Sequence, residues 1–402
     1  MQQFVGRHRW LILLAGAMVQ ILTGIPAAWG VFQQPVMEEY GFSQDGAGYA
    51  FSILIAFFGL GCLLGGYLQD KKGPRAAALW GAALLCGGFC AAAFLPPQRP
   101  GLFYLAFSAP AGLGSAFLYP SIMSCAQKWY ADRKGLATGV IGGAVGASGA
   151  FLTFFVRRAL RGFGPVQGIR GAFWALAALM LPVCLLGSLL LADPPPAKPQ
   201  PQQQGRQYKI PPLDYAPKQM LFTRQYWLLT GAVAFSTPAV LLFSPIILQL
   251  GQQRGLSEKA ALSAVVLGSV GSAAGRLLMP LLSDKIGRRR TDLWLFGTSL
   301  GLSAAFLVAR GWWVVACYAL LTFCYSALAA VLPAFASDLF GLPHAGVNYG
   351  FLALGQSAGS LAFPLLADWL GLQNGRHYLA IAGAMLGFAA VWFIRPTRGG
   401  RV

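Results

Sequence analysis

The segment GGYLQDKKGPR, from Gly65 to Arg75, returns in altered form as PLLSDKIGRRR, from Pro280 to Arg290. In both copies a leucine is followed two residues later by an aspartate, and then by a basic residue, a glycine and an arginine. Each copy ends a long apolar run, so each predicts a short charged turn between two hydrophobic helices. The same turn at matching places in two halves of a chain is typical of an internal repeat.

The composition indicates a membrane protein. Of 402 residues, 56% are hydrophobic and 10% are charged, whereas soluble domains carry about 25% charged residues. The apolar runs are long enough to cross a bilayer as helices, and they lack the alternation of membrane barrel strands. We predict twelve transmembrane helices, at 10–33, 47–69, 76–96, 101–127, 136–156, 171–192, 226–250, 260–283, 291–309, 312–337, 347–371 and 377–395.

A polar segment divides the chain. Residues 193–225 begin DPPPAKPQPQQQGRQ, and a stretch so rich in Pro and Gln predicts an extended linker. Six apolar runs precede it and six follow it. The expected organisation is therefore an N-terminal six-helix bundle in residues 1–192, a cytoplasmic linker in 193–225 and a C-terminal six-helix bundle in 226–402.

The net charge of +18 follows the membrane topology. If the N-terminus is cytoplasmic, most Lys and Arg fall in cytoplasmic segments, which predicts that both termini face the cytoplasm. This charge attracts anionic lipid and requires no nucleic acid. The cell membrane, and more specifically a bacterial inner membrane, is the expected location.

Redox, metal and hydrolytic chemistry find no support in the sequence. The seven cysteines all lie in apolar runs without a CxxC pair, and the three histidines lie at the ends of predicted spans with no nucleophile around them. We therefore expect no enzyme activity, no cofactor and no metal.

Arg276 stands inside the predicted eighth span. Placing an arginine at mid-membrane costs about 2.5–3.5 kcal/mol, and the acidic residues, Asp292 among them, fall in loops or near span ends. An unpaired guanidinium suits a substrate carboxylate, because its fork binds both carboxylate oxygens. The alternative is an arginine that snorkels to the headgroups.

Three stretches carry a family resemblance. The doubled turn resembles the loop motif of the major facilitator superfamily, and GIPAAWGVFQQPVMEEYGFS (24–43) and WYADRKGLATGVIGGAVGAS (129–148) resemble the first and fifth helices of monocarboxylate transporters and the related oxalate:formate antiporters. The resemblance implies two six-helix bundles around a central cavity and transport by alternating access. It also implies that the chain works as a monomer.

The resemblance also assigns roles to residues. It implies that Arg276 binds the substrate carboxylate, and it places Gln356 where the oxalate exchangers carry a second cation, a lysine. One cation suits a monocarboxylate such as lactate or pyruvate, because a dianion would keep an uncompensated charge. The remaining expected wall residues are Tyr119, Tyr325, Asn348 and Ser357. For either tyrosine the alternative is a packed side chain whose hydroxyl is bonded to a neighbouring carbonyl.

The charged turns predict a gate at the cytoplasmic end. We expect Asp70 and Asp284 to take part in contacts that hold the two halves together there, where a carboxylate can pair with Arg133 or Lys134. Arg75 and Arg288 complete the two copies of the loop motif.

The mode of coupling stays open in the sequence. Many relatives carry an aspartate one helical turn before the eighth-helix arginine, and this chain has Ser272. Proton symport of a monocarboxylate leads, carboxylate exchange is the alternative, and a receptor without transport is a third class. The expected partners are the monocarboxylate, a proton and the lipid bilayer.

Overall fold

The computed structural model describes residues 9–130, 134–192, 215–341, 344–371 and 374–395, and its regular elements are all helices. The first half contains α2 (Trp10–Thr23), α3 (Ile25–Tyr40), α4 (Gln44–Lys72), α5 (Pro74–Phe94), α6 (Pro100–Phe103), the π-helical turn η1 (Tyr104–Ser108), α7 (Ala109–Trp129) and α8 (Lys134–Leu190). The second half contains α9 (Pro217–Leu221), α10 (Arg224–Ser236), α11 (Pro238–Leu241), α12 (Ile247–Gln253), α13 (Glu258–Ile286), α14 (Arg288–Val308), α15 (Trp312–Phe340), α16 (Ala345–Leu370) and α17 (Gly375–Trp392).

The all-α membrane fold is confirmed, and the spans are less regular than predicted. In the described part of the chain, nine helices are long and apolar enough to cross a membrane, or ten if the bent pair α2 and α3 is one span. The predicted seventh span is divided into α10, α11 and α12, with Pro238, which cannot donate a backbone hydrogen bond, at the start of α11. The predicted count of twelve is consistent with these helices.

The two copies of the charged turn have the same local structure. In each half a 29-residue helix, α4 or α13, starts at a capping serine, Ser43 or Ser257, whose side chain accepts a backbone hydrogen bond. Each helix ends at a glycine with positive φ, 83° at Gly73 and 94° at Gly287, which favours glycine over other residues. A 21-residue helix, α5 or α14, follows directly.

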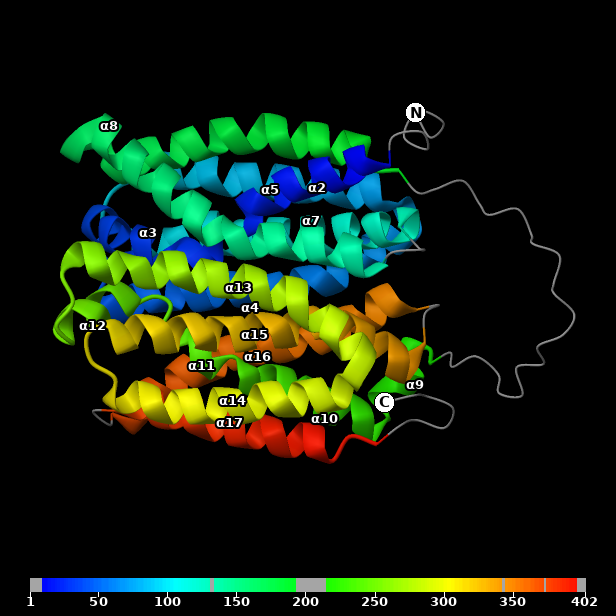
Figure 1. Cartoon of the computed structure of the whole chain (residues 1–402). Helices are drawn as coiled ribbons and strands as arrows, with labels where there is room; N and C mark the ends of the chain where they lie inside the picture. The colour runs from blue at the N-terminus through cyan, green and yellow to red at the C-terminus, as the bar shows by residue number, and fades with distance from the viewer. Residues whose placement is uncertain (1–8, 131–133, 193–214, 342–343, 372–373, 396–402) are drawn as a thin grey trace, which may run out of the picture.

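The apolar core is organised around the two halves. One cluster of buried side chains runs from Ile12 to Leu191 and takes in Leu241, while two others lie wholly between Met220 and Ile394. Figure 1 shows the helices as long rods along one direction, with α2, α5, α7 and α8 on one side and α10, α14 and α17 on the other. Leu190 and Pro217 lie at the same end of the bundle, which we call the linker end, and the opposite end is the far end.

Glycines bring helices of the two halves into close contact. A Cβ on Gly146 of α8 would lie 2.3 Å from Ala273 Cα of α13, and a Cβ on Gly350 of α16 would lie 2.7 Å from Leu63 Cα of α4. Real Cβ atoms do not come so near to other heavy atoms, so these helices pack at a separation that only glycine permits.

Candidate functional site: a cavity between the two halves

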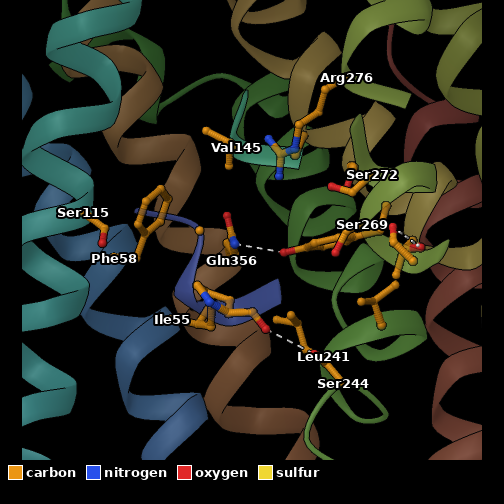
Figure 2. A pocket seen from close by; sticks show the side chains of 18 of the residues that line it. Ile55, Phe58, Ser115, Val145, Leu241, Ser244, Ser269, Ser272, Arg276 and Gln356 are labelled. Atoms are coloured by element: carbon orange, nitrogen blue, oxygen red, sulfur yellow. Dashed lines mark hydrogen bonds between the residues drawn. The ribbon is translucent and has the colours of Figure 1, made fainter. Parts of the chain in front are cut away.

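A central cavity lies between the halves, with an empty volume of about 1070 Å³ that includes the part open to solvent. It is lined from the first half by α4, α7 and α8, together with residues around the bend between α2 and α3, and from the second half by α11, α13, α15 and α16. Figure 2 shows Arg276, Gln356 and several serines directed into it. Among the described lining residues, Arg276 carries the permanent charge, and none is Asp, Glu, Lys or His.

Arg276 enters the cavity from α13, and its guanidinium points toward Gln356 (Figure 2). Its Nε is buried without a hydrogen-bond partner, and no carboxylate among the described residues forms an ion pair with it. The Tyr119 hydroxyl is hydrogen-bonded to Arg276, which also acts electrostatically on the hydroxyl groups of Tyr325 and Tyr349. A buried cation surrounded by neutral hydroxyls lacks the counterion that its desolvation requires, so an anion entering the cavity would find a prepared partner.

The backbone of α13 is held on two sides at Arg276. A Cβ on Gly275 would clash with the Phe323 carbonyl of α15, at 2.5 Å, while Gly142 of α8 lies against Arg276 Cβ, at 3.4 Å from an ideal Cβ position. Ser272, one turn before Arg276, shares a 2.7 Å hydrogen bond with Ser326 of α15. These contacts fix the point from which the guanidinium extends into the cavity.

The structure joins two of the residues predicted for the wall. Gln356 Nε2 of α16 donates a 2.9 Å hydrogen bond to the Tyr325 hydroxyl of α15. Both residues line the cavity, as does Tyr119, whose ring lies 6.3 Å from that of Phe58. Because the Tyr325 oxygen accepts from Gln356, its own proton stays available to an acceptor in the cavity.

Asn348 and Ser357, which were also predicted for the wall, are not among the residues that line this cavity. Asn348 is buried and donates through Nδ2 to the Tyr215 carbonyl at 3.0 Å. Ser357 donates to the Ala56 carbonyl at 2.7 Å and so bonds α16 to α4. Both lie on α16, but on faces that pack against neighbouring segments.

The charged turn of the second half is bonded within that half. Arg288 binds Asp284 one turn earlier on α13 and, at 3.3 Å, Asp338 at the end of α15. Among the described residues, Asp284 is bonded within its own half, through Arg288. In the first half Arg75 donates to the Leu191 carbonyl at 3.2 Å.

Two further predicted gate groups fall outside the described part of the chain. One is Arg133. The other is the side chain of Asp70, a residue in the last turn of α4.

Polar contacts close the far end between the halves. Four of them join helices of the first half to segments of the second, and two are ion pairs. They are Ser244 Oγ to the Pro26 carbonyl (3.2 Å), the Tyr49 hydroxyl to Asp368 (2.5 Å), Arg157 to Glu258 (2.8 Å) and Arg376 to Asp45 (3.5 Å).

Removing both ion pairs in an Asp45→Asn/Glu258→Gln variant should open the far end more often. Exposed pairs contribute about 0.2–1 kcal/mol each, so removing two should shift the population by about twofold to thirtyfold. Labelling of a cysteine placed at Ser269 by a reagent added from the far side measures this shift. Glu39→Gln is the control, since its pair with Arg170 lies within the first half. Equal labelling in both variants would mean that these pairs do not hold the far end closed.

Sequence reasoning missed several wall residues. Tyr349, Ser115 and Phe58 line the cavity, as do Ser269 and Ser272 beside Arg276 (Figure 2). The serines had a detectable signal, because they recur on the helical face that carries Arg276, at spacings of three and four residues. Tyr349 had no comparable sequence signal, because its position in the wall depends on how α16 packs.

Comparisons with known proteins agree with this architecture. The profile of the Major Facilitator Superfamily matches residues 12–307 and 239–402. An oxalate:formate antiporter of Oxalobacter formigenes is 26% identical over 98% of this chain and 93% of its own length. Monocarboxylate transporter 9 of Gallus gallus is 24% identical over 49% of this chain and 38% of its own length.

The fold itself is found in solved transporter structures. That of the proton:xylose symporter XylE superposes with a TM-score of 0.68 at 15% identity, covering 95% of this chain and 94% of the other. The family profile accounts for nearly the whole length, and both halves take part in the match. The chain belongs to the major facilitator superfamily, a family of membrane transporters.

Proposed function

We propose that the protein is a secondary transporter of short monocarboxylates, of the lactate and pyruvate class, which works by alternating access. The observation that carries this proposal is the unpaired guanidinium of Arg276 in a cavity between two halves. The substrate carboxylate would bind the guanidinium fork, and its hydroxyl or keto group would meet the Tyr325 hydroxyl.

The charge of the cavity favours a monoanion. Arg276 supplies one positive charge, and Gln356, to which the guanidinium points, is neutral. A monocarboxylate neutralises Arg276, whereas a dicarboxylate would keep a second negative charge in a site of low dielectric constant. The relative named as an oxalate:formate antiporter supports carboxylates as the substrate class.

The same proposal covers location and assembly. We place the protein in the cell membrane, with a bacterial inner membrane as the specific expectation and both termini on the cytoplasmic side. The distribution of Lys and Arg supports this orientation. Each chain has its own cavity, so a monomer suffices for transport.

Carboxylate exchange is the second candidate function. The overall similarity to the oxalate:formate antiporter favours it, and so does the cavity itself. Without an acidic group among its described lining residues, an empty cavity leaves Arg276 charged, while a bound monoanion makes it neutral. A carrier that moves only when neutral at this site would exchange one anion for another.

Uptake of labelled lactate into proteoliposomes tests the proposal. We expect saturable uptake that is accelerated by unlabelled lactate inside. An imposed pH gradient then separates the two modes, because symport accumulates lactate on the alkaline side while exchange ignores the gradient. Vesicles that take up no lactate and no pyruvate under either condition would refute the proposed substrate class.

Replacing Gln356 with Lys should shift selectivity toward oxalate. Two unit charges about 6 Å apart at an effective dielectric constant near 20 attract by roughly 3 kcal/mol. Desolvation of the new lysine offsets part of this, so we expect about a tenfold rise in the oxalate-to-lactate affinity ratio. Competition of each acid against labelled lactate measures the ratio, and Gln356→Met is the uncharged control. A ratio unchanged by the lysine would show that Gln356 does not face the bound anion.

A further inference from the structure

Asp292, one turn into α14, is a buried acid. Its position at the edge of a predicted span suggested a loop residue, yet its exposed fraction is 4%. Its Oδ1 is buried with no hydrogen-bond partner, and no hydrogen bond to its other oxygen is found among the described residues. Burying a charged carboxylate without partners is costly, and protonation removes this cost.

Asp292 faces a second cavity that adjoins the first. This cavity has an empty volume of about 490 Å³ and is enclosed by α10, α14, α15 and α16. It shares Tyr325, Ala329, Tyr349 and Gln356 with the cavity that contains Arg276. The hydrogen-bonded pair of Gln356 and Tyr325 therefore stands between the acid and the cation.

The charges around Asp292 leave it without a full counterion. Arg288, one turn earlier on α14, acts on it electrostatically, but Arg288 already binds Asp284 and Asp338. On the same helix Arg289 donates to the carbonyls of Val391 and Trp392, and Arg290 is exposed.

The described lining of the second cavity contains no cation. In the lining of its cavity, α10 contributes Ser236, whose hydroxyl is bonded to Val233, α15 contributes Tyr325, and α16 contributes Tyr349 and Gln356. On α17, which also packs against α14, Arg376 and His377 are engaged with Asp45 and Arg254.

We propose that Asp292 is the proton-binding residue that couples transport to the pH gradient, a role that rests on the proposed monocarboxylate function. The proton binds a carboxylate oxygen on the side of the second cavity and leaves from the same atom. Hydronium gives up the proton, so one of its O–H bonds breaks as the carboxyl O–H bond forms, and the reverse transfer to water releases the proton. The substrate anion occupies Arg276 in the adjoining cavity.

Charge balance then ties the two ligands together. In the empty carrier, Arg276 is positive and Asp292 is negative, so their sum is zero. With one monocarboxylate and one proton bound, the sum is again zero, whereas either ligand alone leaves a net charge. Because moving a net charge through the membrane interior is costly, the halves rearrange only when both ligands are bound or both are absent. The result is electroneutral symport of one proton with one monocarboxylate.

The test uses full-length protein in proteoliposomes with lactate as the probe. Wild type should accumulate lactate about tenfold per unit of pH gradient, since one pH unit corresponds to a tenfold ratio. Accumulation should not respond to a membrane potential. In Asp292→Asn this accumulation should vanish, because the empty carrier keeps a net positive charge. Exchange of labelled for unlabelled lactate should continue, because the loaded carrier is neutral.

Matched variants sharpen the result. Asp292→Glu should regain gradient-driven accumulation, and Glu38→Gln should keep both activities, because Glu38 lines neither cavity and binds only Gln34 in the described structure. If Asp292→Asn does not insert, wild type can be treated with dicyclohexylcarbodiimide, which modifies protonated carboxyl groups in apolar surroundings. Mass spectrometry should find the label on Asp292, decreasing as the pH rises.

Each contrary outcome has a separate meaning. Full gradient-driven accumulation in Asp292→Asn, or an Asp292 that the carbodiimide never labels, overturns the proton-binding role. Wild type that exchanges lactate but ignores the pH gradient also overturns it, and leaves the proposed function intact. Wild type that neither exchanges nor accumulates lactate refutes the proposed function itself.

Discussion

Replacing Arg276 with Gln should lower the affinity for lactate by about a hundredfold, because truncating one partner of a buried charged pair costs about 2–5 kcal/mol. Glutamine removes both the charge and the fork, whereas lysine keeps the charge and loses the fork. Arg276→Lys should therefore bind better than Arg276→Gln and worse than wild type. Equilibrium binding of labelled lactate to purified protein measures all three affinities.

The Arg276 variants need a control for folding and for general charge. Arg161, exposed on α8, is an arginine outside the cavity lining, and Arg161→Gln should bind lactate as wild type does. Both Arg276 variants should insert like wild type, because no carboxylate among the described residues forms an ion pair with Arg276. Wild-type affinity in Arg276→Gln would remove this residue from the substrate site.

Replacing Gly146 with Ala should slow lactate exchange by at least tenfold. The added Cβ would lie 2.8 Å from the Ser272 carbonyl carbon of α13 and closer still to the backbone of Ala273. Backbone atoms cannot move aside cheaply, and overpacking of this kind costs about 1–3 kcal/mol. The cost falls on the states in which α8 and α13 are in contact, so one step of the alternating-access cycle becomes rare.

Gly143 provides the matched control, because a Cβ there meets nothing within 4 Å. Gly143→Ala makes the same chemical change on the same helix and should exchange lactate at the wild-type rate. Initial rates of exchange in proteoliposomes, at equal amounts of inserted protein, compare the two variants. Equal rates would show that the contact between α8 and α13 is looser during transport than in this structure.

Much of the fold could be predicted because the bilayer imposes it. Long apolar runs and the doubled charged turn depend only on local composition, and both turns end at the predicted glycines, Gly73 and Gly287. The breaks in the first and seventh spans were harder to predict. Gly24 ends α2, and its free carbonyl accepts from Ser148 of α8, a partner far away in the sequence. The hydropathy of a local stretch of sequence cannot identify a partner so distant in the chain.

The cavity could be predicted less completely. Arg276 stood out because a charge is rare at that depth, and Gln356 came from the family resemblance. Asn348 and Ser357 lie outside the lining of this cavity, and helical spacing alone does not say which face of α16 meets it. Asp292 was misplaced because an acid at the edge of an apolar run resembles a loop residue. Its burial depends on the packing of α10, α15 and α16, which only the tertiary structure shows.

The central claim is that one guanidinium in the cavity binds one monocarboxylate. Equilibrium binding of labelled lactate to purified wild-type protein, with unlabelled pyruvate and oxalate as competitors, tests this most directly. The account predicts a single saturable site from which pyruvate displaces lactate and oxalate does not. Displacement by oxalate as effective as that by pyruvate, or the absence of lactate binding, would contradict it.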